Sequence, residues 1–281
     1  MGRLKGERFE LVTLHSGTRA IRERRSGEVM HPAVGPWAEA CALYVDQLHL
    51  RERLCDGAGE PLVIFDVGLG GAANAAAAIT CARSCGGGRR RTLELLSFEV
   101  DTEPLKLALD DPEGFPFLRP LADAARTLLD QGVWEEDGVR WTLRPGDALK
   151  ALESEKARAE LIFHDPFSPE TNPALWTPEA FALLRSRARQ DERGCLLATY
   201  SASTRTRASM LLGGWNVGVG AATGFKKETT VAATRRALLS NPLGPRWLER
   251  WQRSSARAPW GRDTLSAEEE ALITRAIVPA L

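Results

Sequence analysis

The sequence predicts an α/β fold, a doubly wound, mostly parallel seven-stranded sheet that closes with an antiparallel hairpin. From residue 61 onward, short apolar runs alternate with segments whose apolar residues recur at helical spacing. Such alternation is typical of a parallel sheet covered by helices on both faces. The first run, Leu62–Val67, is apolar apart from one Asp and is bounded by Pro61 and Gly68. A strand buried on both faces has this composition.

The remaining elements follow in chain order. Residues 1–60 are expected to pack on the core as a hairpin and a helix, Phe9–Thr13 with Arg19–Arg22 and then Pro36–Leu54. Residues 61–235 form the central domain, and its further parallel strands are expected at Leu93–Glu99, Val139–Arg144, Leu161–His164 and Cys195–Tyr200. Its helices are expected at Ala72–Ala82, Glu103–Leu109, Phe117–Leu129, Pro178 to about Gln190, and Arg205–Leu212. The closing hairpin is expected from Trp215–Gly220 and Phe225–Ala233, and residues 236–281 form a basic, Trp-containing tail with a final helix from Ser266.

Composition excludes several classes of protein. Hydrophobic residues make up 43% and charged residues 26% of 281 residues, which are ordinary globular values. The net charge of zero argues against a protein that coats nucleic acid indiscriminately, but it leaves a local basic patch open. Five cysteines without framework spacing favour reduced thiols, and no metal site is expected. With no apolar leader or membrane-length run, we expect a cytoplasmic protein without a membrane partner.

A glycine-rich turn follows the first strand of the central domain. Asp66, Gly68 and Gly70 form a D-x-G-x-G pattern that closes the strand and opens a helix of small residues. Glycines suit this position because the turn is tight and a ligand must approach the backbone without Cβ interference. A carboxylate there would repel a pyrophosphate but accepts hydrogen bonds from an ammonium group. The pattern favours S-adenosylmethionine over a dinucleotide, although glycine turns without a ligand also occur in α/β folds.

Two further features lie at the predicted carboxyl ends of the next strands. Glu99 ends the second strand, where an acidic side chain can bind both hydroxyls of a ribose. Asp147 and Ala148 follow the third strand, where such folds commonly hold the adenine. Glu99 could equally be a solvated carboxylate, and Asp147 a helix N-cap. Such features on successive strands predict a ligand along the carboxyl edge of the sheet.

The fourth strand ends in a proline-flanked acidic loop, D-P-F-S-P at Asp165–Pro169. Two prolines favour an extended, rigid turn with few internal hydrogen bonds, which leaves carbonyl groups and Asp165 to face a ligand. Asp165 and a proline carbonyl suit a target amine, whose lone pair must lie in line with the methyl–sulfur bond. A carboxylate also stabilises the cationic product. Asp165 could instead only cap the loop.

This loop and its surroundings resemble the methyltransferase domain of MnmC, the bacterial tRNA 5-methylaminomethyl-2-thiouridine biosynthesis enzyme. The sequence at 165–177, D-P-F-S-P-E-T-N-P-A-L-W-T, is similar to that family's D-x-F-x-P-x-x-N-P-x-x-W motif. L-A-T-Y-S at 197–201 is similar to its L-A-T-[YF]-[ST] strand, and G-F-K-K-E at 224–228 to its K-[RK]-E ending. The resemblance spans about residues 9–233. It implies a Rossmann-like, class I S-adenosylmethionine-dependent methyltransferase.

The resemblance also implies an activity and a role for each matched residue. It implies methyl transfer to the aminomethyl amine of a modified wobble uridine in tRNA. The residues that would orient or deprotonate the amine are Asp165, Pro166 and Phe167. The residues that would hold the cofactor are Asp66, Gly68, Gly70, Asn74, Glu99, Asp147 and Ala148. The residues that would contact the substrate are Asn172, Trp176, Lys226 and Lys227, although the two lysines could also form a solvated strand face.

The sequence departs from the family beside the acceptor loop. Pro166 stands where glycine is common, and His164 stands where leucine is frequent. No second, flavin-dependent oxidase domain is expected in this chain, so any oxidase partner would be a separate protein. Two alternatives remain open. One is a methyltransferase or aminopropyltransferase that acts on a small-molecule amine, and the other is a non-catalytic binding protein that kept the fold.

The C-terminal section is rich in arginine and tryptophan. Seven arginines between residues 235 and 262 stand against one acidic residue, Glu249, with Trp247, Trp251 and Trp260 between them. Arginine interleaved with aromatic residues suits phosphate contact and base stacking in RNA. The alternative is an amphipathic tail that packs its tryptophans on the core and leaves its arginines in solvent.

Overall fold

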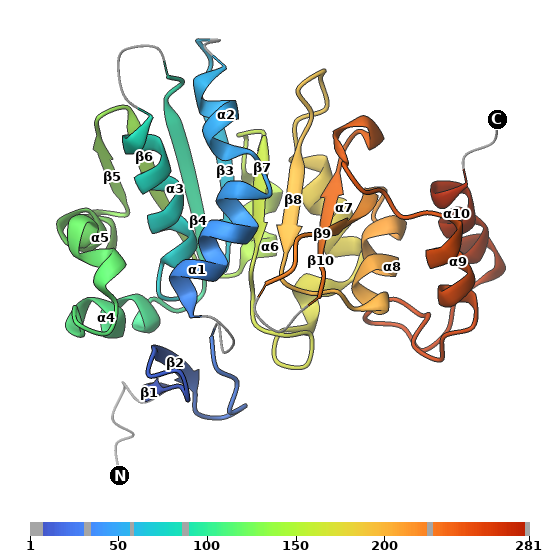
Figure 1. The fold of residues 1–281 in the computed structure, drawn as a ribbon, viewed down its shortest axis with the longest axis horizontal. Helices are drawn as coiled ribbons and strands as arrows, with labels where there is room; N and C mark the ends of the chain where they lie inside the picture. Colours follow the sequence, from blue (N-terminus) through green and yellow to red (C-terminus); the bar gives the residue numbers. More distant parts are fainter. Residues whose placement is uncertain (1–7, 31–34, 57–58, 86–89, 224–226, 279–281) are drawn as a thin grey trace.

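The computed structural model describes residues 8–30, 35–56, 59–85, 90–223 and 227–278. Its centre is a twisted eight-stranded sheet with the order β5-β6-β4-β3-β7-β8-β10-β9 (Figure 1). The strands in chain order are β3 (Leu62–Val67), β4 (Leu93–Glu99), β5 (Val133–Glu136), β6 (Val139–Pro145), β7 (Leu161–His164), β8 (Leu196–Thr199), β9 (Asn216–Gly220) and β10 (Thr229–Ala233). The five strands from β6 to β8 in the sheet order are parallel, and β9 and β10 form the antiparallel hairpin. The predicted α/β fold is confirmed.

The sheet has one strand more than the seven predicted. The additional strand, β5, pairs antiparallel with β6 at one edge. It follows Gly132, a left-handed residue (φ 75°) that ends the preceding helix, and its last two residues are exposed glutamates. A four-residue, half-polar edge strand lacks the continuous apolar run of a central strand, so its sequence resembles a loop.

Helices cover both faces of the sheet, and successive residues of β3 contribute to different faces. Ile64 joins the apolar cluster under one layer of helices, and Phe65 joins the cluster under the other. The first layer contains α1 (Pro36–Ala40), η1 (Cys41–Asp46), α2 (Leu50–Cys55), α3 (Ala73–Ser84), α4 (Glu103–Asp110), η2 (Pro116–Leu121) and α5 (Ala122–Gln131). The second layer contains α6 (Ala148–Ser154), η3 (Pro173–Trp176), α7 (Pro178–Ser186) and α8 (Thr204–Leu212). None of the described helices is long and apolar enough to cross a membrane.

Two segments predicted as single helices are broken. The stretch Pro36–Leu54 divides into α1, which continues directly into the π-helical segment η1, and α2, which is separated from η1 by the left-handed His49 (φ 53°). The stretch Phe117–Leu129 begins as the 3-10 turn η2, which contains Pro120, and becomes α-helical only at Ala122. Proline lacks the N–H that an α-helical turn requires, which explains the second break.

The terminal segments pack on opposite parts of this core. A hairpin of β1 (Phe9–Thr13) and β2 (Arg19–Glu23) lies beyond one end of the sheet, below α1 in Figure 1. At the far edge, η4 (Arg236–Leu238), α9 (Pro245–Gln252) and α10 (Ala267–Ile277) form an end lobe beside α8. Trp247 and Trp251 are buried there with stacked rings. Ser266 caps α10 with a capping box, as the predicted start of the final helix requires.

The strand order fixes where a ligand can bind. From β3 the chain winds outward through β4 to β6, and it then returns to β7, on the other side of β3. In open α/β sheets, ligands bind outside the carboxyl ends of the strands where the winding direction reverses. The carboxyl ends of β3 and β7 carry Gly68 and Asp165.

Candidate active site

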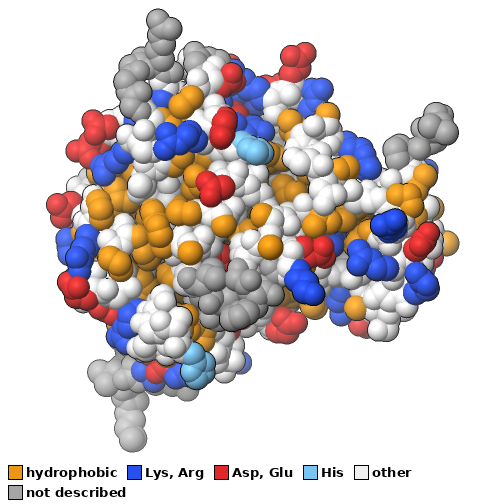
Figure 2. Space-filling model, in the orientation of Figure 1, with side chains coloured by type: hydrophobic (Ala, Val, Ile, Leu, Met, Phe, Trp, Pro, Cys, Tyr) orange, Lys and Arg blue, Asp and Glu red, His pale blue; other side chains and the backbone are white. Residues whose placement is uncertain are grey.

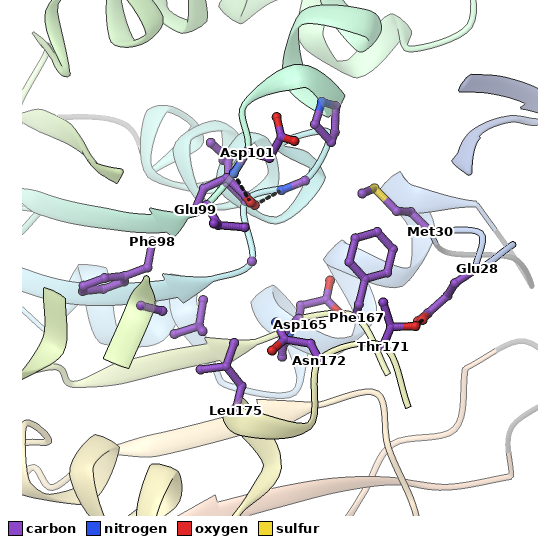
Figure 3. A pocket seen from close by; sticks show the side chains of 18 of the residues that line it. Glu28, Met30, Phe98, Glu99, Asp101, Asp165, Phe167, Thr171, Asn172 and Leu175 are labelled. Atoms are coloured by element: carbon purple, nitrogen blue, oxygen red, sulfur yellow. Dashed lines mark hydrogen bonds between the residues drawn. The ribbon is translucent and has the colours of Figure 1, made fainter. Parts of the chain in front are cut away.

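A cavity of about 550 Å³ lies at this reversal point, within the range of small-molecule sites (Figure 3). Its lining combines the carboxyl ends of β3, β4, β6 and β7 with the N-terminal hairpin and its following residues. The predicted site residues that line it are Gly68, Gly70, Glu99, Asp147, Ala148, Asp165, Pro166, Phe167 and Asn172. In Figure 3, Glu99 and Asp101 lie on one side of the cavity, and Asp165, Asn172 and Phe167 lie on the other.

The glycine turn after β3 is in backbone contact with the acidic loop. Gly68 has φ +95°, and its N–H donates to the Phe98 carbonyl at 3.1 Å. A Cβ at Gly68 would lie 2.6 Å from the Asp165 carbonyl oxygen. Glycine is therefore required here both by the left-handed backbone and by the approach of the neighbouring loop. The sequence predicted the tight turn and the room for a ligand, but not the close approach of the Asp165 loop.

Glu99 organises the wall opposite the acidic loop. Its Oε2 accepts a hydrogen bond from the Gly70 N–H at 3.0 Å, and its Oε1 accepts one from the Asp101 N–H at 3.0 Å. Burial raises the pKa of this carboxyl, and the backbone donors oppose that rise. A carboxylate oxygen has lone pairs for more than one donor, so both oxygens retain capacity for hydroxyl groups in the cavity.

Asp66 lies behind the cavity wall rather than on it. Its side chain is completely buried, and its Oδ2 accepts a hydrogen bond from the Ser97 hydroxyl at 2.7 Å. The Trp141 indole donates to the same hydroxyl at 2.9 Å. Burial, followed by the charges of Asp165 and Glu99, raises the pKa of Asp66 to about 8 despite the Ser97 bond. Asp66 Oδ1 has no hydrogen-bond partner among the described residues, so a cationic group beyond the wall suits this position.

Asp147 is a helix N-cap, and it also lies at the cavity, where its contact with a ligand stays a prediction. It is the N-cap of α6, and its side chain accepts from the Leu149 and Lys150 N–H groups at 2.9 and 3.2 Å. It also lines the cavity with Ala148. The preceding residue, Gly146, has φ +103° and faces open space, which leaves the backbone accessible there.

Asp165 is fixed by hydrogen bonds to strand β3 and helix α3. Its N–H donates to the Val67 carbonyl at 2.9 Å, and its Oδ2 accepts from the Asn74 amide at 2.8 Å. Asn74 is buried on α3 and orients this carboxylate, and its predicted contact with the cofactor stays a prediction. Tyr44 lies close by, and burial together with the charge of Asp165 raises the pKa of its phenol.

Side-chain hydrogen-bond donors fix the rest of the acidic loop in place. The Tyr200 hydroxyl donates to the Pro166 carbonyl at 3.1 Å, and the Trp176 indole donates to the Phe167 carbonyl at 2.9 Å. Trp176 is completely buried and does not line the cavity, so it fixes the loop from behind rather than contacting a substrate. The two prolines of the loop have no N–H group and cannot donate hydrogen bonds within it. The tyrosine hydroxyl and the tryptophan indole therefore satisfy the loop carbonyl groups.

The N-terminal hairpin region supplies contacts that sequence reasoning missed. Glu28 accepts three hydrogen bonds from the acidic loop, from the Ser168 N–H and hydroxyl at 2.8 Å each and from the Thr171 hydroxyl at 2.6 Å. Phe9 of β1 stacks on Phe167 with ring centroids 6.2 Å apart. The hairpin itself was predicted, but no motif in its sequence indicates which distant loop it covers.

The remaining predicted residues lie away from the cavity. His164 is buried against the rings of Trp176 and Phe181, its Nε2 lies 3.0 Å from the Leu175 carbonyl, and burial lowers its pKa to about 4. The His164 side chain, which stands where the family frequently has leucine, therefore does not face the acceptor side of the cavity. Lys227 is exposed and does not line the cavity, and Lys226 lies outside the described residues.

The charges around the cavity select for a cationic ligand. Among the described lining residues, one cation, Arg8, accompanies six carboxylates, which are Glu28, Glu39, Glu99, Asp101, Asp147 and Asp165. Like charges within a low-dielectric cavity repel a phosphate and attract sulfonium or ammonium groups. No group of three or more His, Cys, Asp or Glu residues that could hold a metal ion occurs in the described part of the chain.

Comparison with known proteins agrees with this chemistry. A family model described as S-adenosyl-L-methionine-dependent methyltransferase matches residues 125–235. The bifunctional tRNA 5-methylaminomethyl-2-thiouridine biosynthesis protein MnmC of Hahella chejuensis is 31% identical over 194 residues, which cover 65% of this chain and 30% of that protein. The crystal structure of MNMC2 from Aquifex aeolicus matches with a TM-score of 0.73 and 25% identity, over 95% of this chain and 84% of that one.

The chain contains an MnmC-like, S-adenosylmethionine-dependent methyltransferase domain. MnmC of Pseudomonas syringae pv. syringae is 28% identical over 243 residues, which cover 82% of this chain and 36% of the relative. The chain thus spans about a third of the length of the curated relatives it matches. S-adenosylmethionine fits the cavity of the MnmC-like domain, whose buried Asp66 oxygen and acidic walls suit a cationic cofactor.

Proposed function

We propose that the domain transfers a methyl group from S-adenosylmethionine to the aminomethyl amine of a modified wobble uridine in tRNA, in the cytoplasm. The observation that carries this proposal is the position of Asp165, which is fixed by Asn74 and lies in backbone contact with the Gly68 turn. A donor held by the turn and an amine held by Asp165 would meet within one cavity. The names of the relatives support tRNA as the source of that amine.

S-adenosylmethionine, when bound, supplies an electrophilic methyl group on a sulfonium centre. We assign its binding to Gly68, Gly70, Glu99, Asp147 and Ala148, with Asp66 behind the wall. The two oxygens of Glu99 have the spacing and capacity to accept both ribose hydroxyls. The ionised form of Asp66 would stabilise an ammonium group, and that cation would in turn lower the pKa of Asp66 from the value of about 8 that burial gives it in the cofactor-free protein.

The acceptor nitrogen must be a neutral amine with its lone pair directed at the methyl carbon. The Asp165 carboxylate would accept a hydrogen bond from this neutral nitrogen and orient it. As the N–C bond forms, the C–S bond breaks and its electron pair stays on sulfur. The new ammonium group then loses a proton to Asp165 or to solvent. Phe167 and Asn172 would contact the nucleoside beside it, and Trp176 would keep the loop in place.

The direct test uses labelled S-adenosylmethionine and bulk tRNA from a strain that lacks the endogenous methyl-transfer step, followed by nucleoside analysis. We expect label in a methylaminomethyl uridine. Label that reaches only free small amines would favour the alternative, a small-molecule amine methyltransferase. Cofactor binding without transfer to any acceptor would favour the non-catalytic alternative.

A further inference from the structure

Helix α9 presents arginines on the side that faces away from the core. Trp247, Leu248 and Trp251 bury the inner side of this helix. Arg246 and Arg250 lie on α9 and Arg253 is its C-cap residue, and their spacings of four and three residues place them on one side of the helix. All three side chains are exposed, and none forms an ion pair with another described residue. These three residues are the α9 arginine stripe.

Other arginines of the end lobe hold the structure together. Arg257 pairs with Glu270 at 2.8 Å, and Arg262 pairs with Glu179 and Glu269. Arg236 donates to the Ala276 and Leu243 carbonyls at 3.4 and 3.3 Å. Within the stripe, Arg253 donates one hydrogen bond to the Glu249 carbonyl at 3.2 Å, but all three guanidinium groups are exposed and have no ion pair with another described residue. In a protein whose net charge is zero, such a local excess of cations indicates an anionic partner.

The middle residue of the stripe, Arg250, lies toward the edge of the sheet that carries the cavity. Arg250 lies near the buried Arg207, whose pKa is lowered chiefly by burial and further by the charge of Arg250. Arg207 pairs with Glu228 at 3.1 Å, immediately before β10. The start of β10 lies beside the carboxyl end of β8, where Thr230 pairs with Thr199. Figure 2 shows Lys and Arg side chains gathered over this end of the molecule.

The cavity and the stripe have opposite charge and so suit different parts of one substrate. The acidic lining of the cavity attracts an amine and repels phosphate groups. An RNA whose modified base enters the cavity must therefore have its phosphates held elsewhere. The stripe offers three guanidinium groups on a rigid helix, anchored by the stacked pair Trp247 and Trp251.

We propose that the α9 arginine stripe binds the phosphate backbone of the RNA whose base is methylated in the cavity. The proposal rests on the proposed function for the identity of the RNA. In this proposal the arginines of the stripe bind RNA phosphates, and the tryptophans of α9 pack on the core. The sequence had left these two roles as alternatives for the whole C-terminal section.

The test measures binding of bulk tRNA to the full chain at several salt concentrations between about 50 and 200 mM, without methyl transfer. The variant Arg246→Gln/Arg250→Gln/Arg253→Gln should bind more weakly, and the slope of log affinity against log salt should fall by about 2 to 3. The matched control, at the other end of the sheet, neutralises three exposed arginines that pair with acids: Arg119→Gln, Arg126→Gln and Arg140→Gln. It should leave the slope within about 1 of wild type.

Two further variants separate charge from folding. Replacing the stripe arginines by lysine keeps the charge and should restore most of the affinity and the slope. Glu249→Gln removes the acidic residue of the same helix and should tighten tRNA binding. A wild-type protein that does not bind tRNA, or equal slopes for wild type and the Gln variant, overturns the proposal.

Methyl transfer is scored separately in the same preparations. Transfer to tRNA by wild type, with unchanged binding by the Gln variant, would refute the stripe and leave the proposed function intact. Salt-sensitive binding through the stripe, with no label in any RNA nucleoside, would refute the proposed function and leave the RNA surface in place.

Discussion

Replacing Asp66 by asparagine isolates the free-energy cost of burying its carboxylate. Asp66 is completely buried, and its pKa is raised from an ordinary 3.8 to about 8, chiefly by burial. An acid whose pKa is higher in the folded state binds more protons there than in the unfolded chain. The contribution of the Asp66 proton to the free energy of unfolding is therefore fully present below about pH 4. It is lost as the pH rises toward 8.

The magnitude follows from the shift. About four pKa units correspond to roughly 5 kcal/mol, or about 1.4 kcal/mol per pH unit across this window. Asparagine keeps an oxygen for the Ser97 hydroxyl, but it places an amide donor where Asp66 Oδ1 has no partner. Below about pH 8 the protonated wild-type carboxyl also carries a donor, so the amide should add only a modest, pH-independent offset of about 1 kcal/mol. Asp66→Asn should thus remove the slope and add a constant offset.

The assay is urea unfolding of cofactor-free wild type and Asp66→Asn at pH 5, 6, 7 and 8. The difference between the two free energies of unfolding cancels other titrating groups, such as His164, and should change by roughly 1.4 kcal/mol per pH unit. Parallel pH profiles for the two proteins would refute the reasoning. They would mean that Asp66 is ionised in the folded protein or reaches solvent.

Three other substitutions test the contacts around the acidic loop. Gly68→Ala should lower the free energy of unfolding by about 2 kcal/mol or more in urea titration, because of its positive φ and its approach to the Asp165 carbonyl; an unchanged midpoint would contradict this. Glu28→Gln leaves one accepting oxygen for three donors of the acidic loop and should slow methyl transfer about tenfold with little change in melting temperature, whereas Glu10→Gln in the nearby hairpin should not. Trp176→Phe leaves the Phe167 carbonyl without its donor and should lower kcat/KM about tenfold in steady-state assays without changing cofactor affinity. Equal loss of cofactor affinity would mean that Trp176 supports the whole cavity.

The sequence predicted those parts of the fold that have continuous apolar runs ending in glycine-containing turns. The bounds of β3, β4 and β7 match the prediction, because buried parallel strands must be apolar on both faces. The position of the cavity was also predictable, because parallel strands bring Gly68, Glu99, Asp147 and Asp165 to one edge. The edge strand β5 was not, since its pattern is that of a polar loop.

The roles of individual site residues were harder to predict, because they depend on contacts between distant segments. Asn74 lies in a helix that follows the glycine turn, yet its amide orients Asp165. Trp176, the last residue of the N-P-x-x-W part of the motif, donates to the Phe167 carbonyl from behind the loop. Glu28 has no motif at all, and only the folded chain brings it to Ser168 and Thr171. Sequence spacing identifies a sheet edge, but not which side chains reach across it.

The central claim is that Asp165 serves the acceptor amine and not the cofactor. The measurement that tests it most directly compares Asp165→Asn with wild type in single-turnover methyl transfer to undermethylated tRNA, alongside calorimetric titration with S-adenosylmethionine. Transfer should fall by about a hundredfold or more, while cofactor affinity stays within about threefold. Transfer at a near wild-type rate, or loss of cofactor binding together with transfer, would contradict the account.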